Sequence, residues 1–160
     1  MIILHYTAGV SAQSSPRYLA RPDVKASAHL VIGRLGKIIQ LVSFDVEAWH
    51  AGKSFHLGRV NLNHYSIGIE LDNLGKLRRE GDKFIAECGK EVPASEVFVD
   101  EQEDQPTYWH RYPETQLRTV VLVCALLSEH YPIRYLLRHS DITPRKIDPG
   151  PAFPQEILEM

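Results

Sequence analysis

The segment MIILHYTAG, residues 1–9, decides the fold of this chain and contains its first candidate functional side chain. Residues 1–4 are apolar without a break, which predicts a short, buried β-strand over residues 1–6. His5 ends this strand, and a small polar turn follows it. The end of the strand is therefore the first place to look for a site.

Other segments of the chain predict further strands. Residues 27–42 predict a hairpin whose turn is Gly33-Arg34-Leu35-Gly36. Residues 65–71 alternate enough to predict another strand, and residues 135–139 predict one more. This last strand again ends on a histidine, His139.

The clearest helix is predicted over residues 113–131. Pro113 suits the first helical position, and apolar residues recur at helical spacing at Leu117, Val120, Val121, Cys124, Leu127 and Tyr131. Leu122, Val123 and Leu126 widen the apolar face, so we expect the helix to pack deeply. Cys124 is expected to be a small buried hydrophobe.

Two segments are less regular. Residues 11–22 form a polar connection, with a helical piece predicted around residues 15–20. The region from about 75 to 112 is charged and interrupted by glycine and proline, with short strands predicted at residues 83–86 and 96–100. We expect this region to be an irregular insertion rather than a second domain.

The composition indicates one domain without a nucleic-acid surface. A chain of 160 residues that are 44% hydrophobic can fill a single core. Lys plus Arg (18) against Asp plus Glu (20) gives a net charge of −2 with no long block of either sign, so we expect no nucleic-acid partner. Cys88 and Cys124 lack C-x-x-C spacing, which excludes a disulfide framework and a thiolate zinc site.

The sequence also predicts no membrane span. No apolar run approaches the roughly 18 residues that would cross a bilayer, and no basic leader with a cleavage site precedes the first strand. We therefore expect a protein that is cytoplasmic as synthesised, with export by another route or release during phage lysis left open. The oligomeric state is open as well.

Several motifs fail on inspection. Residues 51–54, AGKS, lack the glycine at position 47 that a phosphate-binding loop requires, because Glu47 stands there. Neither H-E-x-x-H nor G-x-S-x-G occurs. His139, Ser140 and Asp141 are neighbours in sequence and cannot all point at one another as a catalytic triad.

The remaining candidates are polar groups at strand ends. His5 and His139 end two predicted strands, and Asp148 follows in a loop stiffened by Pro144, Pro149 and Pro151. Two neutral imidazoles and a carboxylate are ligands that zinc accepts, and three ligands leave a fourth position for water or substrate. Such a centre can polarise a carbonyl and acidify water. Spacing alone leaves the alternative open, since eight histidines give many pairs and a histidine at a strand end is often a hydrogen-bonded structural residue.

Five blocks of sequence, in order, carry a family resemblance: HYTAG (5–9), SAHLVI (27–32), AWHAG (48–52), NHYSIGIE (63–70), and HSDI (139–142) with KIDPG (146–150). They are similar to those of the zinc-dependent N-acetylmuramoyl-L-alanine amidases of the peptidoglycan-recognition superfamily. The resemblance runs from residue 1 to about residue 154 and is poor between about 75 and 112.

This resemblance implies a set of roles. His5, His139 and Asp148 would be the zinc ligands, and the substrate would be the amide between the lactyl group of N-acetylmuramic acid and L-alanine of the peptidoglycan stem peptide. Glu70 would act as general base and then acid, which suits a carboxylate on a strand that faces the metal. Lys146 would stabilise the negative charge that develops on the tetrahedral oxygen.

Further residues match the family less specifically. His50 and Asn63 match positions that line the groove for the muramyl-peptide, while Trp49 is either a core residue or a platform for a sugar. Ala28 before His29, with Glu70 in the later strand, fits the AmpD-type pattern. Whether the partner is intact peptidoglycan or a soluble muropeptide stays open. Four histidines match no motif and are expected to be surface or structural residues: His56, His64, His110 and His130.

The patterns and the resemblance together predict an α/β fold: a single domain over residues 1–160, with a mixed central β-sheet flanked by helices and the zinc at one end of the strands. The expected activity is zinc-dependent hydrolysis of the muramoyl-alanine amide. The alternatives are a peptidoglycan-binding protein of the same fold without activity, and a structural zinc module. A structural module would need four closed ligands, and no fourth ligand occurs at a sensible spacing.

Overall fold

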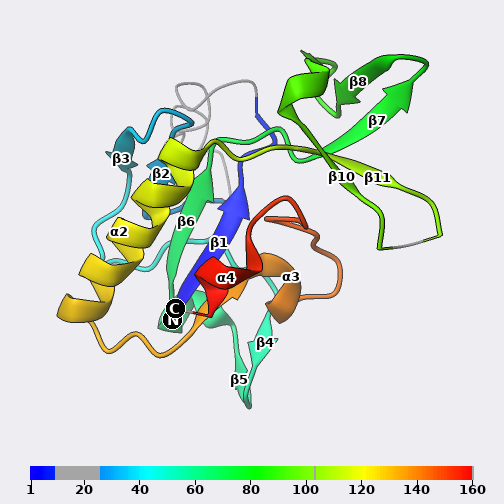
Figure 1. Ribbon diagram of the computed structural model, residues 1–160. Coiled ribbons are helices and arrows are strands. Elements are labelled where there is room, and N and C mark those ends of the chain that lie inside the picture. Colours follow the sequence, from blue (N-terminus) through cyan, green and yellow to red (C-terminus); the bar gives the residue numbers. More distant parts are fainter. Residues whose placement is uncertain (10–25, 103, 160) are drawn as a thin grey trace.

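The computed structural model describes residues 1–9, 26–102 and 104–159 (Figure 1). The helical piece predicted around residues 15–20 lies outside this described part. The central sheet has the strand order β12-β1-β6-β2-β3. Its strands are β1 (Ile2–Tyr6), β2 (Leu30–Ile32), β3 (Ile38–Gln40), β6 (Ile67–Leu71) and β12 (Leu136–Arg138). All neighbours pair in parallel except β2 with β3, which confirms the predicted mixed sheet.

Helices cover this sheet, which confirms the predicted α/β class. Helix α2 (Glu114–His130) lies across one face (Figure 1). Ile2 and Leu4 of β1 belong to the main core cluster, which includes buried residues of α2, whereas Ile3 belongs to a smaller cluster on the opposite face. Successive side chains of a strand point to opposite faces, so β1 contributes to both clusters. The second cluster also draws residues from η1 (Leu62–Tyr65) and α3 (His139–Ile142), and the last helix is α4 (Gln155–Leu158).

The buried face of α2 is narrower than the sequence suggested. Val120, Cys124 and Leu127 are buried, as predicted. Leu122 and Leu126, however, are 70% and 57% exposed, so the expectation that they widen the buried face was wrong. The reason is that α2 packs on the sheet with one side only, and among the described residues no further layer covers its outer side.

A second, antiparallel sheet with the order β10-β11-β7-β8-β9 occupies the region predicted to be irregular. Its strands are β7 (Lys76–Glu80), β8 (Lys83–Ala86), β9 (Glu91–Val92), β10 (Val97–Asp100) and β11 (Thr107–His110), with η2 (Ala94–Glu96) between β9 and β10. The two short strands predicted there correspond to β8 and β10. The expectation of irregularity was wrong because five short strands share a small core cluster of their own, which includes Leu74, Leu77 and Val97.

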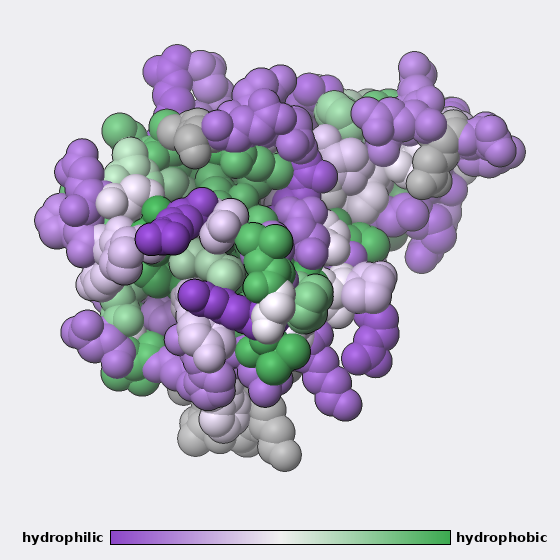
Figure 2. Space-filling view, turned by 90° about the horizontal axis from the view of Figure 1, so that it is seen from below, coloured by the Kyte–Doolittle hydropathy of each residue, from purple (hydrophilic) through white to green (hydrophobic). Residues whose placement is uncertain are grey.

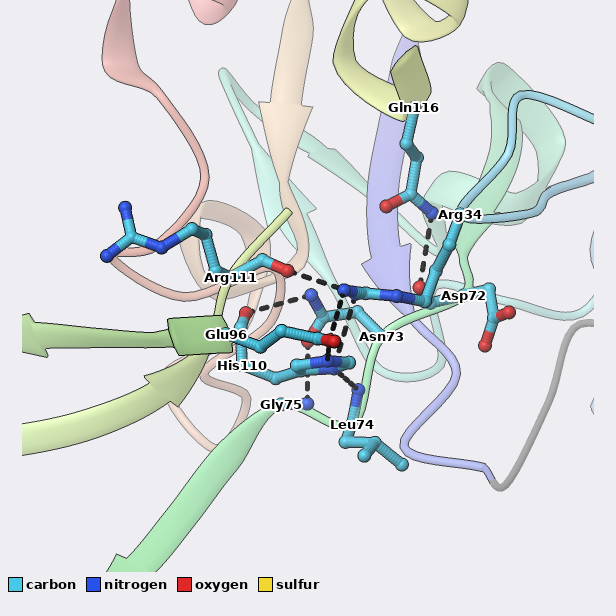
Figure 3. A network of polar contacts seen from close by, with 9 residues as sticks. All are labelled: Arg34, Asp72, Asn73, Leu74, Gly75, Glu96, His110, Arg111 and Gln116. Atoms are coloured by element: carbon cyan, nitrogen blue, oxygen red, sulfur yellow. Dashed lines mark hydrogen bonds and ion pairs between the residues drawn. The ribbon is translucent and has the colours of Figure 1, made fainter. Parts of the chain in front are cut away.

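A polar network joins the second sheet to the central one (Figure 3). The carboxylate of Glu96 accepts hydrogen bonds from Arg34, in the β2–β3 turn, at 2.7 Å and from the ring of His110 at 3.1 Å. The other ring nitrogen of His110 accepts a hydrogen bond from the backbone N–H of Leu74 at 3.0 Å. The side chain of Asn73 donates to the carbonyl of His110 at 2.9 Å. These bonds hold together the two segments that connect the second sheet to the rest of the chain, one at residues 73–74 and the other at His110.

The lower end of the molecule carries the hairpin of β4 (Phe55–His56) and β5 (Arg59–Val60), which projects from the body (Figure 1). Phe55, Leu57 and Val60 are all more than half exposed. In the view from below, apolar residues reach the surface in the middle of this face and hydrophilic residues surround them (Figure 2). Among the described residues, no helix combines the length and the apolar character that crossing a membrane requires.

Candidate metal centre

The parallel register of β1 and β6 places two chemical groups side by side. His5 lies opposite Glu70 in this pairing. Ile69 and Leu4, the residues before them, point into the core beneath α2, so the side chains of His5 and Glu70 point to the other face of the sheet. Both residues lie near the carboxyl ends of their strands, where open α/β sheets usually bind ligands.

The other two candidate ligands come from the end of the chain. β12 pairs in parallel with β1, and His139 follows it as the first residue of α3, rather than as the last residue of the strand as predicted. Asp148 lies in the next loop, and its carbonyl accepts a hydrogen bond from the backbone N–H of Ser140 at 3.2 Å. The hydroxyl of Tyr112 donates to the carbonyl of Pro149 at 2.9 Å and holds this loop on the core.

Three side-chain atoms converge at this point. The Nδ1 atoms of His5 and His139 are 2.9 Å apart, and the Oδ2 atom of Asp148 is 3.1 Å from the first and 2.9 Å from the second. All three residues are buried, and they form the one cluster of possible metal ligands found in the described part of the chain. Tetrahedral bonds of about 2.0–2.1 Å to zinc separate ligand atoms by about 3.3 Å, so the donor set and its spacing fit such an ion.

The charge states of these groups also suit a cation. Burial raises the pKa of Asp148, but the close contacts of its Oδ2 atom with the rings of His139 and His5 outweigh this effect and hold the pKa well below its usual range. Burial lowers the pKa of His5, although Asp148 opposes the shift. An ionised carboxylate beside a neutral imidazole is the protonation state that metal binding requires.

Glu70 adds a carboxyl group that lacks a partner. Its Oε2 atom is buried, and none of the described residues provides a hydrogen-bond partner for it. Burial and, to a smaller extent, the charge of Asp148 raise the pKa of Glu70 to about 8, against the opposing effect of Lys146. A carboxyl group with a raised pKa and an unused oxygen can take up a proton and return it near neutral pH.

These groups line a cavity of about 410 Å³. Its walls include the three candidate ligands together with Glu70, Lys146, Trp49 and His50. Trp49 is 56% exposed, so it is a surface residue here and not a core residue. Lys146 is also exposed, and its contact with a developing oxyanion stays a prediction.

Asn63 and His50 make contacts within the protein. The Oδ1 atom of Asn63 accepts hydrogen bonds from the backbone N–H groups of His50 and Ala51, at 3.1 and 2.7 Å. Asn63 does not line the cavity of about 410 Å³ but another one, so its predicted contact with substrate remains untested. The Nδ1 atom of His50 lies 3.0 Å from Nε2 of His5, behind the candidate ligand. Burial, followed by the nearby His5 and His29, holds the pKa of His50 well below its usual value.

Sequence reasoning missed Ser66, whose hydroxyl lies 3.3 Å from Nε2 of His50. The residue belongs to the NHYSIGIE block, which was the only signal that could have drawn attention to it. Its contact with His50 depends on the fold, since the two residues are 16 positions apart.

Comparisons with known proteins agree on one family. Residues 1–151 match the sequence model of Amidase_2, described as N-acetylmuramoyl-L-alanine amidase. The chain is 33% identical over 151 residues to the 1,6-anhydro-N-acetylmuramyl-L-alanine amidase AmpD of Escherichia coli (strain K12), covering 92% of this chain and 64% of AmpD. It is 32% identical to the N-acetylmuramoyl-L-alanine amidase AmiD of the same strain, over 99% of this chain and 51% of AmiD. The chain thus spans less than two thirds of the length of these relatives.

Solved structures give the same result. The structure of E. coli AmiD in complex with anhydro-N-acetylmuramic acid-L-Ala-D-γ-Glu-L-Lys matches with a TM-score of 0.75 at 28% identity, covering 99% of this chain and 56% of that one. A crystal structure of AmpD, as its selenomethionine derivative, matches with a TM-score of 0.63 at 26% identity, covering 99% of this chain and 82% of that one.

Proposed function

The chain belongs to the N-acetylmuramoyl-L-alanine amidase family, and on this premise we propose that it hydrolyses the amide between the lactyl group of N-acetylmuramic acid and L-alanine of the peptidoglycan stem peptide. The observation that carries the proposal is the convergence of two Nδ1 atoms and a carboxylate oxygen beside Glu70, which has an unpartnered buried oxygen. We further propose that residues 1–160 form the amidase domain, with an insertion at about residues 75–112.

We propose zinc as the cofactor, held by His5, His139 and Asp148. Two neutral nitrogens and one carboxylate are a donor set that zinc accepts, and three protein ligands leave one position open. When bound there, zinc would supply a Lewis acid that polarises the amide carbonyl and acidifies water. The remaining steps depend on the chain's own residues.

Glu70 is proposed to move the proton. Its raised pKa and unpartnered Oε2 allow the carboxylate to take a proton from the attacking water and then deliver it to the departing amine of L-alanine. Lys146, two residues before Asp148 and on the wall of the same cavity, is proposed to stabilise negative charge on the carbonyl oxygen.

The substrate and the residues that contact it are proposed from the cavity lining and from the ligand of a relative. AmiD binds an anhydro-muramyl tripeptide in its complex, so a muropeptide or a stretch of peptidoglycan is the proposed partner of this chain. Trp49 is exposed on the cavity wall and is proposed to stack against the sugar. His50 and Asn63 are retained as proposed groove residues, although each also bonds within the protein.

Metal analysis combined with an amidase assay tests the proposal. We expect about one zinc per chain and the release of L-alanine-linked peptide from anhydro-muropeptides, with loss of release when a chelator removes the metal. Zinc at unit stoichiometry without cleavage of either soluble muropeptides or intact sacculi would contradict the enzymatic function and favour a peptidoglycan-binding protein of the same fold. Comparing the rates on these two substrates would also identify the physiological one.

A further inference from the structure

A second cavity of about 440 Å³ adjoins the candidate metal centre. Its walls include Tyr6, Lys76, Arg78, Ile85, Glu87 and Ile147. Four residues, Tyr6, Ala8, Glu87 and Ile147, line both this cavity and the first one, so they lie at the junction of two neighbouring parts of one groove. The far wall of the second cavity is built by β7 and β8 of the second sheet.

That wall carries two exposed cations, Lys76 and Arg78. Lys76 and Arg78 alternate with Leu77, which points into the small core of the second sheet, so the two cations share the opposite face. The ammonium of Lys76 lies 5.7 Å from the ring centroid of Trp109. Arg78 forms an ion pair with the exposed Glu80 at 2.6 Å. An exposed ion pair adds little stability, so Arg78 can leave Glu80 and bind an anionic ligand instead.

The chemistry of the wall fits an acidic residue of the substrate. In a stem peptide of the L-Ala-D-γ-Glu type, the γ-linkage leaves the α-carboxylate of glutamate free, one residue beyond the amide to be cleaved. Glu87, at the junction of the two cavities, disfavours a carboxylate there and so favours its placement at the Lys76 end. Ile85 and Ile147 offer apolar contact to the methylene groups of the peptide.

We propose that the second cavity binds the residue after L-alanine in the stem peptide and that Lys76, supported by Arg78, recognises its free carboxylate. This proposal rests on the proposed amidase function and extends it to the specificity of the same groove. The second sheet, which the polar network of Asn73 and His110 attaches to the body, would then serve as the peptide wall of the site (Figure 3).

Two substrates that differ in one group test the proposal. Muramoyl-L-alanyl-D-glutamate carries the free carboxylate, and muramoyl-L-alanyl-D-isoglutamine carries an amide in its place. We expect the zinc-loaded wild-type protein to cleave the glutamate compound with a kcat/KM about 10-fold higher, mainly through KM, because a hydrogen bond to a charged group is lost with the amide. Lys76→Met, which keeps the aliphatic contact with Trp109, should remove this preference, so that its kcat/KM values for the two compounds agree within about 2-fold.

Lys83→Met is the matched control, because Lys83 lies on the same sheet but is not part of this cavity wall and pairs with Glu91 at 2.9 Å. It should retain the preference of the wild type. Two results would overturn the role of the wall and leave the amidase function standing. One is equal cleavage of both compounds by the wild type, and the other is an unchanged preference in the double variant Lys76→Met/Arg78→Met. If the wild type cleaved neither compound, the amidase function itself would fail.

A separate observation concerns the ring of His5. Nε2 of His5 is 3.0 Å from Nδ1 of His50, Nε2 of His50 is 3.3 Å from the hydroxyl of Ser66, and that hydroxyl is 2.6 Å from the carbonyl oxygen of Leu62. The ring of His50 is wedged against Gly68, where a Cβ atom would approach within 2.3 Å of it. The ring of His50 therefore has little room to move within this series of contacts.

The carbonyl of Leu62 determines the direction of each hydrogen bond in this series of contacts. A carbonyl only accepts, so Ser66 donates its proton to Leu62 and must accept from Nε2–H of His50. A neutral imidazole has one N–H group, so Nδ1 of His50 is an acceptor and Nε2–H of His5 donates to it. The lone pair of His5 Nδ1 is then left to point toward His139 and Asp148.

We infer that His50 and Ser66 are positioning residues that select the metal-binding tautomer of His5. This role is independent of the peptide wall, and it differs from a direct contact of His50 with substrate. Outer residues of this kind change metal affinity by about 10- to 100-fold when they are removed.

Zinc affinity and nitrogen NMR test this inference without an activity assay. Ser66→Ala should weaken zinc binding about 10-fold in competition with a chromogenic chelator, whereas Ser66→Thr, which keeps the hydroxyl, should restore it. In the zinc-loaded wild type, the ¹⁵N spectrum should place the single ring proton of His50 on Nε2.

Ser54→Ala is the matched control for the serine variant. The hydroxyl of Ser54 accepts a hydrogen bond from the backbone N–H of Leu62 at 3.0 Å, so it supports the same segment without touching His50. It should bind zinc as the wild type does. A ring proton of His50 on Nδ1, or equal zinc affinity in Ser66→Ala and the wild type, would overturn the inference.

Discussion

Two groups of histidine and carboxylate in the described part of the chain differ in how their polar atoms are paired: the network around the buried His110 and the partly exposed Glu96, here called the closed cluster, and the candidate metal centre with Glu70, here called the open cluster. In the network at the base of the second sheet, each ring nitrogen of His110 has a protein partner and Glu96 is paired with Arg34 (Figure 3). At the candidate metal centre, the ring nitrogens of His5 and His139 instead converge on each other and on one carboxylate oxygen. Buried polar groups are nearly always paired. A cluster whose polar atoms all pair within the protein therefore indicates a structural role, whereas a cluster whose ligand atoms converge on one point indicates a binding site for a metal ion.

Glu96 in the first cluster and Glu70 in the second have pKa values shifted in opposite directions. The hydrogen bond from His110 lowers the pKa of Glu96, against a smaller opposing effect of burial. Burial and the charge of Asp148 raise the pKa of Glu70 to about 8, and among the described residues no hydrogen bond reaches its buried Oε2 atom to oppose this. The same residue type therefore stays ionised in one cluster and can exchange a proton near neutral pH in the other.

Removing a ligand from the open cluster should have the largest effect. Asp148→Asn should abolish zinc binding and lower the amidase rate by more than the ~10⁴-fold that loss of a general base alone produces. Zinc content and muropeptide release measure the two effects. Glu96→Gln, the equivalent change in the closed cluster, should keep its zinc. If Asp148→Asn retained zinc at unit stoichiometry, the contrast between the clusters would fail.

Changing Glu70 should separate chemistry from metal binding within the open cluster. Glu70→Gln keeps the shape of the side chain but cannot take up a proton, so kcat should fall by roughly 10²–10⁴-fold. The zinc content should stay at one per chain. Steady-state kinetics on an anhydro-muropeptide measure the loss, and a rate within a few-fold of the wild type would exclude Glu70 as the base.

Removing the histidine of the closed cluster should change stability. His110→Ala leaves the buried N–H of Leu74 without its acceptor, which should reduce the free energy of unfolding by about 1–3 kcal/mol. Urea unfolding of the zinc-free protein measures this loss, and zinc affinity measured separately should match the wild type. Loss of zinc with unchanged stability would reverse the assignment of the two clusters.

The central sheet could be predicted because its signals are local, whereas the strand ends only nominated the three converging side chains and the family resemblance assigned them as ligands. The unbroken apolar run before His5 predicted a buried strand, and the rigid loop around Asp148 predicted a fixed carboxylate. The central sheet was then found as a mixed sheet with three parallel pairings, which brings the ends of β1 and β12 together. The roles of Glu70 and Lys146 came from the family resemblance and stay predictions.

The second sheet and the partners of the buried histidines could not be predicted, because they depend on contacts distant in sequence. The strands of the second sheet are only two to five residues long. Charged residues on their exposed face obscure the alternation of apolar and polar residues that would identify a strand. His110 was expected to be a surface or structural residue, and it is a buried structural one, but its partners Arg34 and Glu96 lie 76 and 14 positions away. Leu122 is likewise exposed because no other element packs on that side of α2 among the described residues. The spacing of apolar residues along a helix does not show which side is covered.

The smallest expected effect is the response of the closed cluster to acid. Burial lowers the pKa of His110, the charge of Arg34 lowers it further, and Glu96 opposes the shift. His110 therefore stays neutral in the folded protein at a pH where the unfolded chain already binds a proton, so stability should fall as the pH drops below about 6.5. Glu96, with its lowered pKa, acts in the same direction at lower pH, although its exposure screens the effect.

A non-titrating variant isolates this contribution, because other buried histidines also respond to acid. The zinc-free wild type should lose stability more steeply than His110→Asn between pH 7.5 and 5.5, with a difference in the loss of less than about 1 kcal/mol. Urea unfolding at each pH measures both proteins. Parallel curves would mean that His110 has the same pKa in the folded and unfolded states, and a shallower loss in the wild type would mean that Glu96 outweighs burial. In either case the closed cluster would not hold its histidine neutral, and the contrast with the open cluster would then depend on the arrangement of ligand atoms alone.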